Sequence, residues 1–105
     1  MNPDTEPESA SNNFSTWLGT IDVLIQRLRL GKADEAHQAL VVVMMEGLSR
    51  FGGPESEVMQ ECFPPLDRIK RQIDAADLDG AHRLTLHLRR QLGEVLDLVA
   101  SLGRD

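Results

Sequence analysis

Four stretches of this chain repeat large apolar residues at steps of three and four positions, and only short breaks separate them. This spacing places the apolar side chains along one side of an α-helix, so each stretch predicts an amphipathic helix. Because the breaks are short, consecutive helices must lie antiparallel and bury their apolar sides against one another. The sequence therefore predicts an all-α protein folded as an up-down four-helix bundle.

Glycine and proline mark the boundaries between the predicted helices. Gly31 is typical of a residue that follows a helix end, and Gly52-Gly53-Pro54 interrupts the chain near its middle. Residues 1–13 contain two prolines, three acidic residues and no large apolar side chain after Met1, which predicts a disordered acidic tail. Residues 14–105 then form a single helical-bundle domain. The four predicted helices cover about 14–30, 32–50, 54–76 and 80–102.

Two adjacent prolines, Pro64 and Pro65, fall inside the third predicted helix. Interior prolines remove helical hydrogen bonds and bend or break a helix. The apolar stripe nevertheless keeps its phase from Met59 to Leu66 and beyond, and both prolines project away from it. We therefore expect one helix that is kinked at Pro64-Pro65, with the prolines toward solvent; a complete break into two helices is the alternative.

The two predicted hairpins align with each other at an offset of 45 residues. Each hairpin has one apolar side that it cannot bury alone, so two packed hairpins complete one bundle. We interpret the halves as a repeat. The shared residues include an acid, an alanine and a histidine in the same order: Asp34 with Asp79, Ala36 with Ala81, and His37 with His82.

The turn from Gly31 to Ala36 resembles the turn of tetratricopeptide repeats, in which a small alanine lets two helices approach closely. The period of 45 residues is longer than the ~34 of that family. In size, acidity and hairpin layout the chain is similar to the small helical-bundle export chaperones of flagellar and type III secretion systems. No motif places it in that family.

Charge and composition narrow the classes of partner. The net charge of −6 argues against a nucleic-acid partner, since phosphate contacts need clustered Lys and Arg. No apolar run approaches the ~20 residues that span a membrane, and no secretory signal is visible, so the cytoplasm is the expected location.

Cys62 is the single cysteine of the chain, so an internal disulfide is excluded. A lone cysteine fits a reducing compartment. Because Cys62 falls on the apolar stripe of the third helix, we expect its side chain to pack in the core.

Little in the sequence points to catalysis or to a cofactor. No phosphate loop, dinucleotide fingerprint or nucleophile motif is present, so the chain is not expected to be an enzyme. His37 and His82 occupy equivalent positions beside acidic residues, but metal ligands normally come in convergent sets of three or four. A small metal- or ligand-binding bundle that uses these two histidines is therefore the alternative function.

The second predicted helix departs from the pattern of the other three. Its run Ala39-Leu40-Val41-Val42-Val43-Met44-Met45 is apolar on more than one side, whereas the fourth helix has polar residues outside. An apolar face beyond the core stripe indicates an interaction surface, unless the tail or the 52–58 loop covers it. The stripe expected to face the core is Ala36, Leu40, Val43 and Gly47. On the fourth helix the residues expected to face inward are Ala81, Leu84, Leu88, Leu92, Val95, Leu96, Val99 and Leu102. The candidate partner interface is Val41, Met44, Met45 and Leu48.

These expectations combine into one hypothesis about function. The chain is interpreted as a non-enzymatic protein–protein interaction module, such as an adaptor, a regulator or a secretion-type chaperone. It uses the outer face of the second helix to form a homodimer or to bind a partner helix.

Overall fold

The computed structural model describes the backbone of residues 6–102 and the side chains of residues 12–102. Within these residues the protein is all-α, with four helices and no strand, as the apolar periodicity predicts. The helices are α1 (Glu6–Arg29), α2 (Ala33–Phe51), α3 (Glu57–Asp74) and α4 (Leu78–Leu102).

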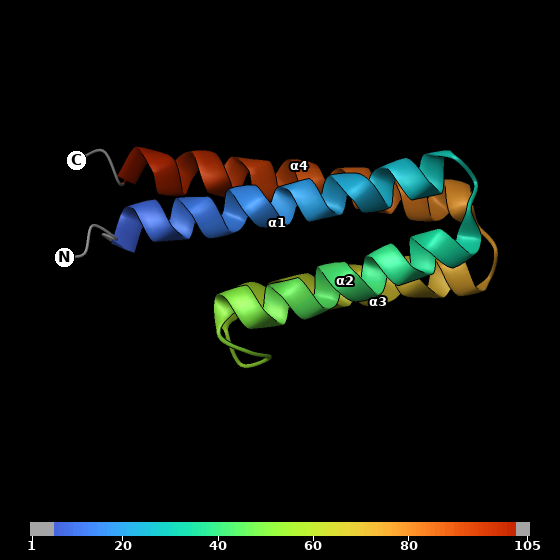
Figure 1. Cartoon of the computed structure of the whole chain (residues 1–105), viewed down its shortest axis with the longest axis horizontal. Helices are drawn as coiled ribbons and strands as arrows, with labels where there is room; N and C mark the ends of the chain where they lie inside the picture. The colour runs from blue at the N-terminus through green and yellow to red at the C-terminus, as the bar shows by residue number, and fades with distance from the viewer. Residues whose placement is uncertain (1–5, 103–105) are drawn as a thin grey trace.

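The helices form an elongated bundle in which each helix has two neighbours. Helix α1 packs against α2 and α4, and α3 packs against the same two helices from the other side. The bundle measures 47 × 22 × 20 Å. Figure 1 shows both short turns, α1 to α2 and α3 to α4, at one end of the molecule. The α2–α3 loop, the start of α1 and the end of α4 lie at the other end, which we call the open end (Figure 1).

The centre of the core is a contact between Trp17 and α2. The Trp17 side chain is fully buried, and its indole N–H donates a hydrogen bond of 2.8 Å to the Val43 carbonyl oxygen. Gly47 leaves the space for this ring, because a Cβ at that position would lie 2.9 Å from both Trp17 Cζ2 and Met59 Sδ. Helices α1, α2 and α3 therefore pack closely at Gly47, because glycine has no side chain to keep Trp17 and Met59 apart.

The buried sides of the helices agree with the predicted stripes. In α2 the buried residues are Ala36, Leu40, Val43 and Gly47, the set expected to face the core. Ala36 and Ala81, the matched alanines of the two hairpins, are both fully buried and allow close approach of neighbouring helices. Apolar burial at these positions supplies the main stabilising free energy of the bundle.

The structure differs from the sequence expectation at the start of α1. Residues 6–13 of the predicted tail are helical, while residues 1–5 lie outside the described residues. Once a helix is nucleated, each further residue adds a hydrogen bond at little extra cost. The Asn13 amide also donates to the Arg50 carbonyl, and Arg50 Nη1 donates to Asn13 Oδ1, each at 3.5 Å. These contacts extend the α1–α2 interface beyond the apolar stripe.

The last turns of α4 also differ from expectation. Val95 and Leu102 were expected to face inward, but they are 39% and 67% exposed. The cause is helix length: α1 and α4 have 24 and 25 residues, whereas α2 and α3 have 19 and 18. The C-terminal turns of α4 therefore extend past α3, and α1 is the helix that remains beside them (Figure 1).

The two hairpin turns have the same structure. Gly31 and Ala76, which the 45-residue offset aligns, both have left-handed backbones, with φ of 74° and 62°. Their N–H groups donate to Leu28 and Ile73, one turn back in each hairpin. The next amide donates to the Arg27 carbonyl in one turn and to the Gln72 carbonyl in the other. This double hydrogen bond is the Schellman motif that ends many helices. The repeat itself stays a prediction, but the local geometry agrees with it.

Replacing Ala76 with glycine should stabilise the protein. A left-handed backbone costs a residue with a side chain about 1–2 kcal/mol, and the greater freedom of glycine in the unfolded chain offsets part of the gain. We expect the free energy of unfolding to rise by roughly 0.5–1 kcal/mol in urea denaturation. The matched change Gly31→Ala should lower it by about 1 kcal/mol. A destabilised Ala76→Gly variant would contradict this account of the turn.

Helix α3 continues through both prolines without a break from Glu57 to Asp74. Pro64 is exposed, as expected, but Pro65 is half-buried, so the expectation that both face solvent was wrong for Pro65. Successive helical residues lie about 100° apart, so the two rings cannot share one outward direction. The bend at Pro64-Pro65 stays a prediction.

Replacing Pro64 with alanine should be neutral or stabilising, by up to about 3 kcal/mol, because an interior proline is that much less favourable than alanine in a helix. Thermal and urea unfolding would measure the change. Gln60→Ala, at an exposed position one turn earlier, is the control and should change stability by less than about 0.5 kcal/mol. A clear loss of stability in Pro64→Ala would show that the proline shapes a bend that the bundle needs.

Candidate interaction surfaces

The outer face of α2 carries an exposed strip without a charged side chain. Val41, Val42 and Met45 are 41%, 46% and 65% exposed. Gln38 and Ser49 extend the strip in both directions and are also exposed. We call these five residues the α2 strip. In a chain of which 27% is charged, an uncharged surface of this length is a specific feature.

The α2 strip contains only part of the predicted interface. Val41 and Met45 lie on it, but Met44 and Leu48 are half-buried and pack against the core. Sequence reasoning left Val42 out of the interface. The sequence could have included it, because Val42 is three residues before Met45 and therefore lies on the same side of the helix.

A shallow apolar hollow of about 330 Å³ continues the α2 strip onto α1. Gly19 leaves this hollow open, since a Cβ there would have no atom within 4 Å. At its edge, Thr20 donates a hydrogen bond of 2.9 Å to the Glu46 carboxylate, which also accepts one from Arg50. The Glu46 carboxylate is therefore already hydrogen-bonded within the protein. The hollow is lined by Thr16, Gly19, Thr20, Val23, Ala39 and Val42.

The equivalent face of α4 has a different chemistry. At the 45-residue offset, Val42 and Met45 correspond to His87 and Arg90, which are exposed and polar. Val41 corresponds to Leu86, an apolar residue with a similar exposure of 42%. At these matched positions, α2 therefore has a continuous apolar row, whereas α4 has a single apolar residue between polar ones.

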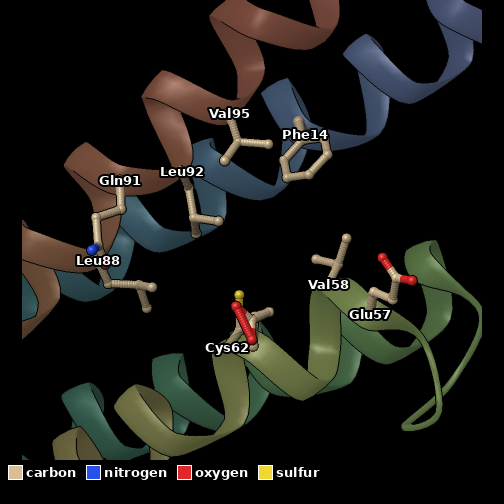
Figure 2. Close-up of a pocket in the computed structure, with 9 residues that line it drawn as sticks. Phe14, Glu57, Val58, Cys62, Leu88, Gln91, Leu92 and Val95 are labelled. Atoms are coloured by element: carbon tan, nitrogen blue, oxygen red, sulfur yellow. The ribbon is translucent and has the colours of Figure 1, made fainter.

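A second apolar surface is a groove of about 480 Å³ between α3 and α4 at the open end. Figure 2 shows Leu88, Leu92 and Val95 of α4 directed toward Val58 and Cys62 of α3 across the groove. Phe14 closes it from the side of α1, and Glu57, Glu61 and Gln91 are its polar residues. We call it the open-end groove.

Exposed leucines extend beyond the open-end groove on α4. Leu98 and Leu102 are both more than half exposed and follow Val95 toward the end of the helix. Sequence reasoning missed this surface. The predicted lengths gave no signal for it, because the helices expected over about 54–76 and 80–102 are equally long, whereas the α3 that forms covers only Glu57–Asp74.

Cys62 lies at the floor of the open-end groove. The side chain is buried, and burial raises the pKa of its thiol to about 11, with a further contribution from the Glu61 carboxylate. The thiol is therefore protonated at neutral pH, which opposes a role as a nucleophile. Its position agrees with the predicted packing role.

The two histidines of the alternative metal site are both half-buried. His37 lies near Asp74, whose carboxyl pKa is lowered first by a hydrogen bond from Lys70 and, to a smaller extent, by the His37 charge. Among residues 6–102, no group of three or more His, Cys, Asp or Glu side chains is arranged to hold a metal ion. No structural observation thus brings His82 together with His37 and a third ligand.

Comparison with known proteins adds no relative. No protein-family model matches the chain, and neither a curated protein nor a solved structure matches it. None of the helices over the described residues is long and apolar enough to cross a membrane. The α2 strip and the open-end groove are therefore the features of the described residues that bear on function.

The raised pKa of Cys62 predicts slow alkylation by iodoacetamide. An ordinary thiol has a pKa of about 8.5, so a pKa of about 11 lowers the thiolate fraction at pH 8 about 200-fold. The rate should rise about tenfold per pH unit from pH 7 to 9.5, without a plateau. Glu61→Gln should shift this profile to lower pH, because it removes the second cause of the raised pKa. The same protein in urea is the control, and a plateau near pH 8.5 in the folded protein would contradict the prediction.

Proposed function

We propose that this chain is a non-enzymatic protein–protein interaction module that pairs with a second copy of itself through the α2 strip. The observation that carries the proposal is the exposed, uncharged row on α2, formed by Val41, Val42 and Met45 between Gln38 and Ser49. An exposed apolar patch on a small protein is typical of an interaction site. Methionine suits such a surface because its side chain adapts to its neighbours.

A second copy is favoured because the strip is neutral while the chain is acidic. With a net charge of −6, two copies repel at most of their surfaces. A two-fold axis through the α2 strip would place uncharged residues against uncharged residues and keep the nearby Glu46 in its own hydrogen bonds. Two α2 helices would then pack at the usual spacing of about 8–10 Å.

The α2 strip and the hollow beside it offer apolar area that association would bury. Burial of apolar area contributes about 25 cal/mol per Å², so a few hundred Å² from each copy contributes several kcal/mol before the cost of association. The hollow beside Val23 adds area on α1, so the interface extends beyond one helix. A stable dimer normally buries about 800 Å² per partner, which the strip and the hollow must supply together.

The wider role we propose is that of a cytoplasmic adaptor, regulator or secretion-type chaperone. A non-catalytic role fits the state of the single cysteine, since burial raises the pKa of the Cys62 thiol and keeps it protonated at neutral pH. The single cysteine also fits a reducing compartment. Binding of a partner helix by the α2 strip, in place of a second copy, is the competing outcome of the test below.

Replacing both Val41 and Met45 with glutamate should dissociate the dimer. Four buried carboxylates would face one another across the two-fold axis, and such desolvated like charges cost several kcal/mol. Light scattering after size-exclusion chromatography should give the mass of a dimer for the wild type and of a monomer for the variant. Circular dichroism should show unchanged helicity, because both side chains lie outside the core.

The matched control is Leu86→Glu with Arg90→Glu, which alters the equivalent positions on α4. This control should remain dimeric, although it makes the chain more acidic than the Val41→Glu, Met45→Glu variant does. A wild-type protein that is monomeric at all concentrations would remove self-association from the proposal. Equal dissociation in both variants would show that net charge, and not the α2 strip, controls the mass.

A further inference from the structure

We infer that the open-end groove is a second binding site and that its occupant is a basic amphipathic helix of another protein. The groove lies between α3 and α4, whereas the α2 strip faces outward from α2 beside α1. The inference therefore rests on a separate surface and does not depend on self-association through α2.

The floor of the groove is apolar and belongs to three helices. Val58 and Cys62 come from α3, Leu92 and Val95 from α4, and Phe14 from α1 (Figure 2). Beyond Val95, the exposed Leu98 and Leu102 lengthen the apolar surface along α4. A helix that lies along this surface would bury a row of its own apolar residues at spacings of three and four.

The α3 edge of the groove carries acceptors of hydrogen bonds. Glu57 and Glu61 line this edge, and neither forms an ion pair with a residue that the structure describes. The negative charge of Glu61 is felt at the floor, where it contributes to the raised pKa of the Cys62 thiol. An unpaired acidic edge beside an apolar floor favours a partner with Lys or Arg next to its apolar row.

Proline in α3 adds a backbone acceptor beside Glu61. Helical hydrogen bonds run from each N–H to the carbonyl four residues earlier, and proline has no N–H. Pro65 therefore leaves the Glu61 carbonyl without its helical donor. Glu61 is the residue next to Cys62, and both line the groove. Its carbonyl and the Glu57 and Glu61 carboxylates are thus acceptors that Lys and Arg side chains can satisfy.

A helical partner fits better than an extended one. An extended peptide needs backbone hydrogen bonds along its length, but the groove offers only Glu57, Glu61 and Gln91 as polar side chains. A helix satisfies its backbone internally and can lie on apolar side chains alone. It would also continue the packing of the bundle, as a fifth helix over the uncovered turns of α4.

The chain itself offers poor occupants for this site. Residues 1–5 and 103–105, outside the described residues, contain Met1 as their single large apolar side chain. A second copy would bring a net charge of −6 to an edge that is already acidic. The two surfaces thus favour different partners because their charges differ. The neutral α2 strip favours a second copy, and the acidic open-end groove favours a basic helix.

The direct test uses two labelled peptides of about 18 residues that contain no tryptophan. Both have leucine at positions spaced by three and four, and the remaining positions are lysine in one and glutamate in the other. Fluorescence anisotropy with the full chain should show micromolar binding of the lysine peptide and at least tenfold weaker binding of the glutamate peptide. The lysine peptide should also slow alkylation of Cys62, because it covers the thiol.

Matched variants separate the groove from general charge attraction. Val95→Glu should weaken binding of the lysine peptide at least tenfold, although it makes the protein more acidic. Leu86→Glu, at an exposed apolar position elsewhere on α4, should leave binding unchanged or slightly stronger. Glu57→Gln with Glu61→Gln should weaken binding several-fold, whereas Asp34→Asn with Asp79→Asn, an equal change of net charge, should have little effect.

Several results would overturn the inference. Equal effects of Val95→Glu and Leu86→Glu, or equal binding of both peptides, would show that the groove does not select a basic helix. If neither peptide binds and Val95→Glu converts a dimer to a monomer, a second copy occupies the groove. The Val41→Glu, Met45→Glu variant should bind the lysine peptide like the wild type, so the two proposals fail independently. Loss of peptide binding in that variant would assign the peptide to the α2 strip.

Discussion

The contact of Trp17 with α2 at Gly47 is the constraint on which the rest of the structure depends. The indole ring fills the space that Gly47 leaves, and its N–H bond to the Val43 carbonyl sets how α1 lies along α2. With Val43 and Gly47 held against the core, Val41 and Met45 must lie on the far side of the helix. The exposure of the α2 strip is thus a consequence of core packing, and an added side chain at Gly47 would disturb both.

The two ends of the bundle differ because the chain connects them differently. At one end, two turns of the same hydrogen-bonded form hold α1 to α2 and α3 to α4. At the other end the α2–α3 loop is the single connection between described helices, and α1 and α4 extend beyond it. The short pair cannot cover the long pair there. Unequal helix length therefore leaves Leu98 and Leu102 exposed beyond the open-end groove without any special local sequence.

Features that follow from the periodicity of apolar residues were predicted from the sequence. Features that depend on the relative lengths of the helices, or on the direction of a single side chain, were missed. Helix number, the buried face of α2 and the turn at Gly31 follow from spacing and from glycine, so they were predicted correctly. The exposure of Val95 was missed because a stripe shows which side of a helix is apolar, not whether a neighbour covers it. Pro65 was misplaced because a single outward direction cannot contain two successive residues. The candidate interface was predicted in part, since Met44 and Leu48 lie at the side of α2 where packing against the core decides exposure.

The two surfaces have different chemistry for a reason that the helices themselves provide. The α2 strip is neutral, so two copies of it would meet without repulsion in the dimer that we propose. On α3, Glu57 and Glu61 line the groove, and Pro65 leaves the Glu61 carbonyl without its helical donor. Since these faces belong to different helix pairs, occupation of one leaves the other accessible. A dimer formed through α2 would then carry two open-end grooves, and two linked sites bind a partner with paired basic helices far more tightly than one site alone.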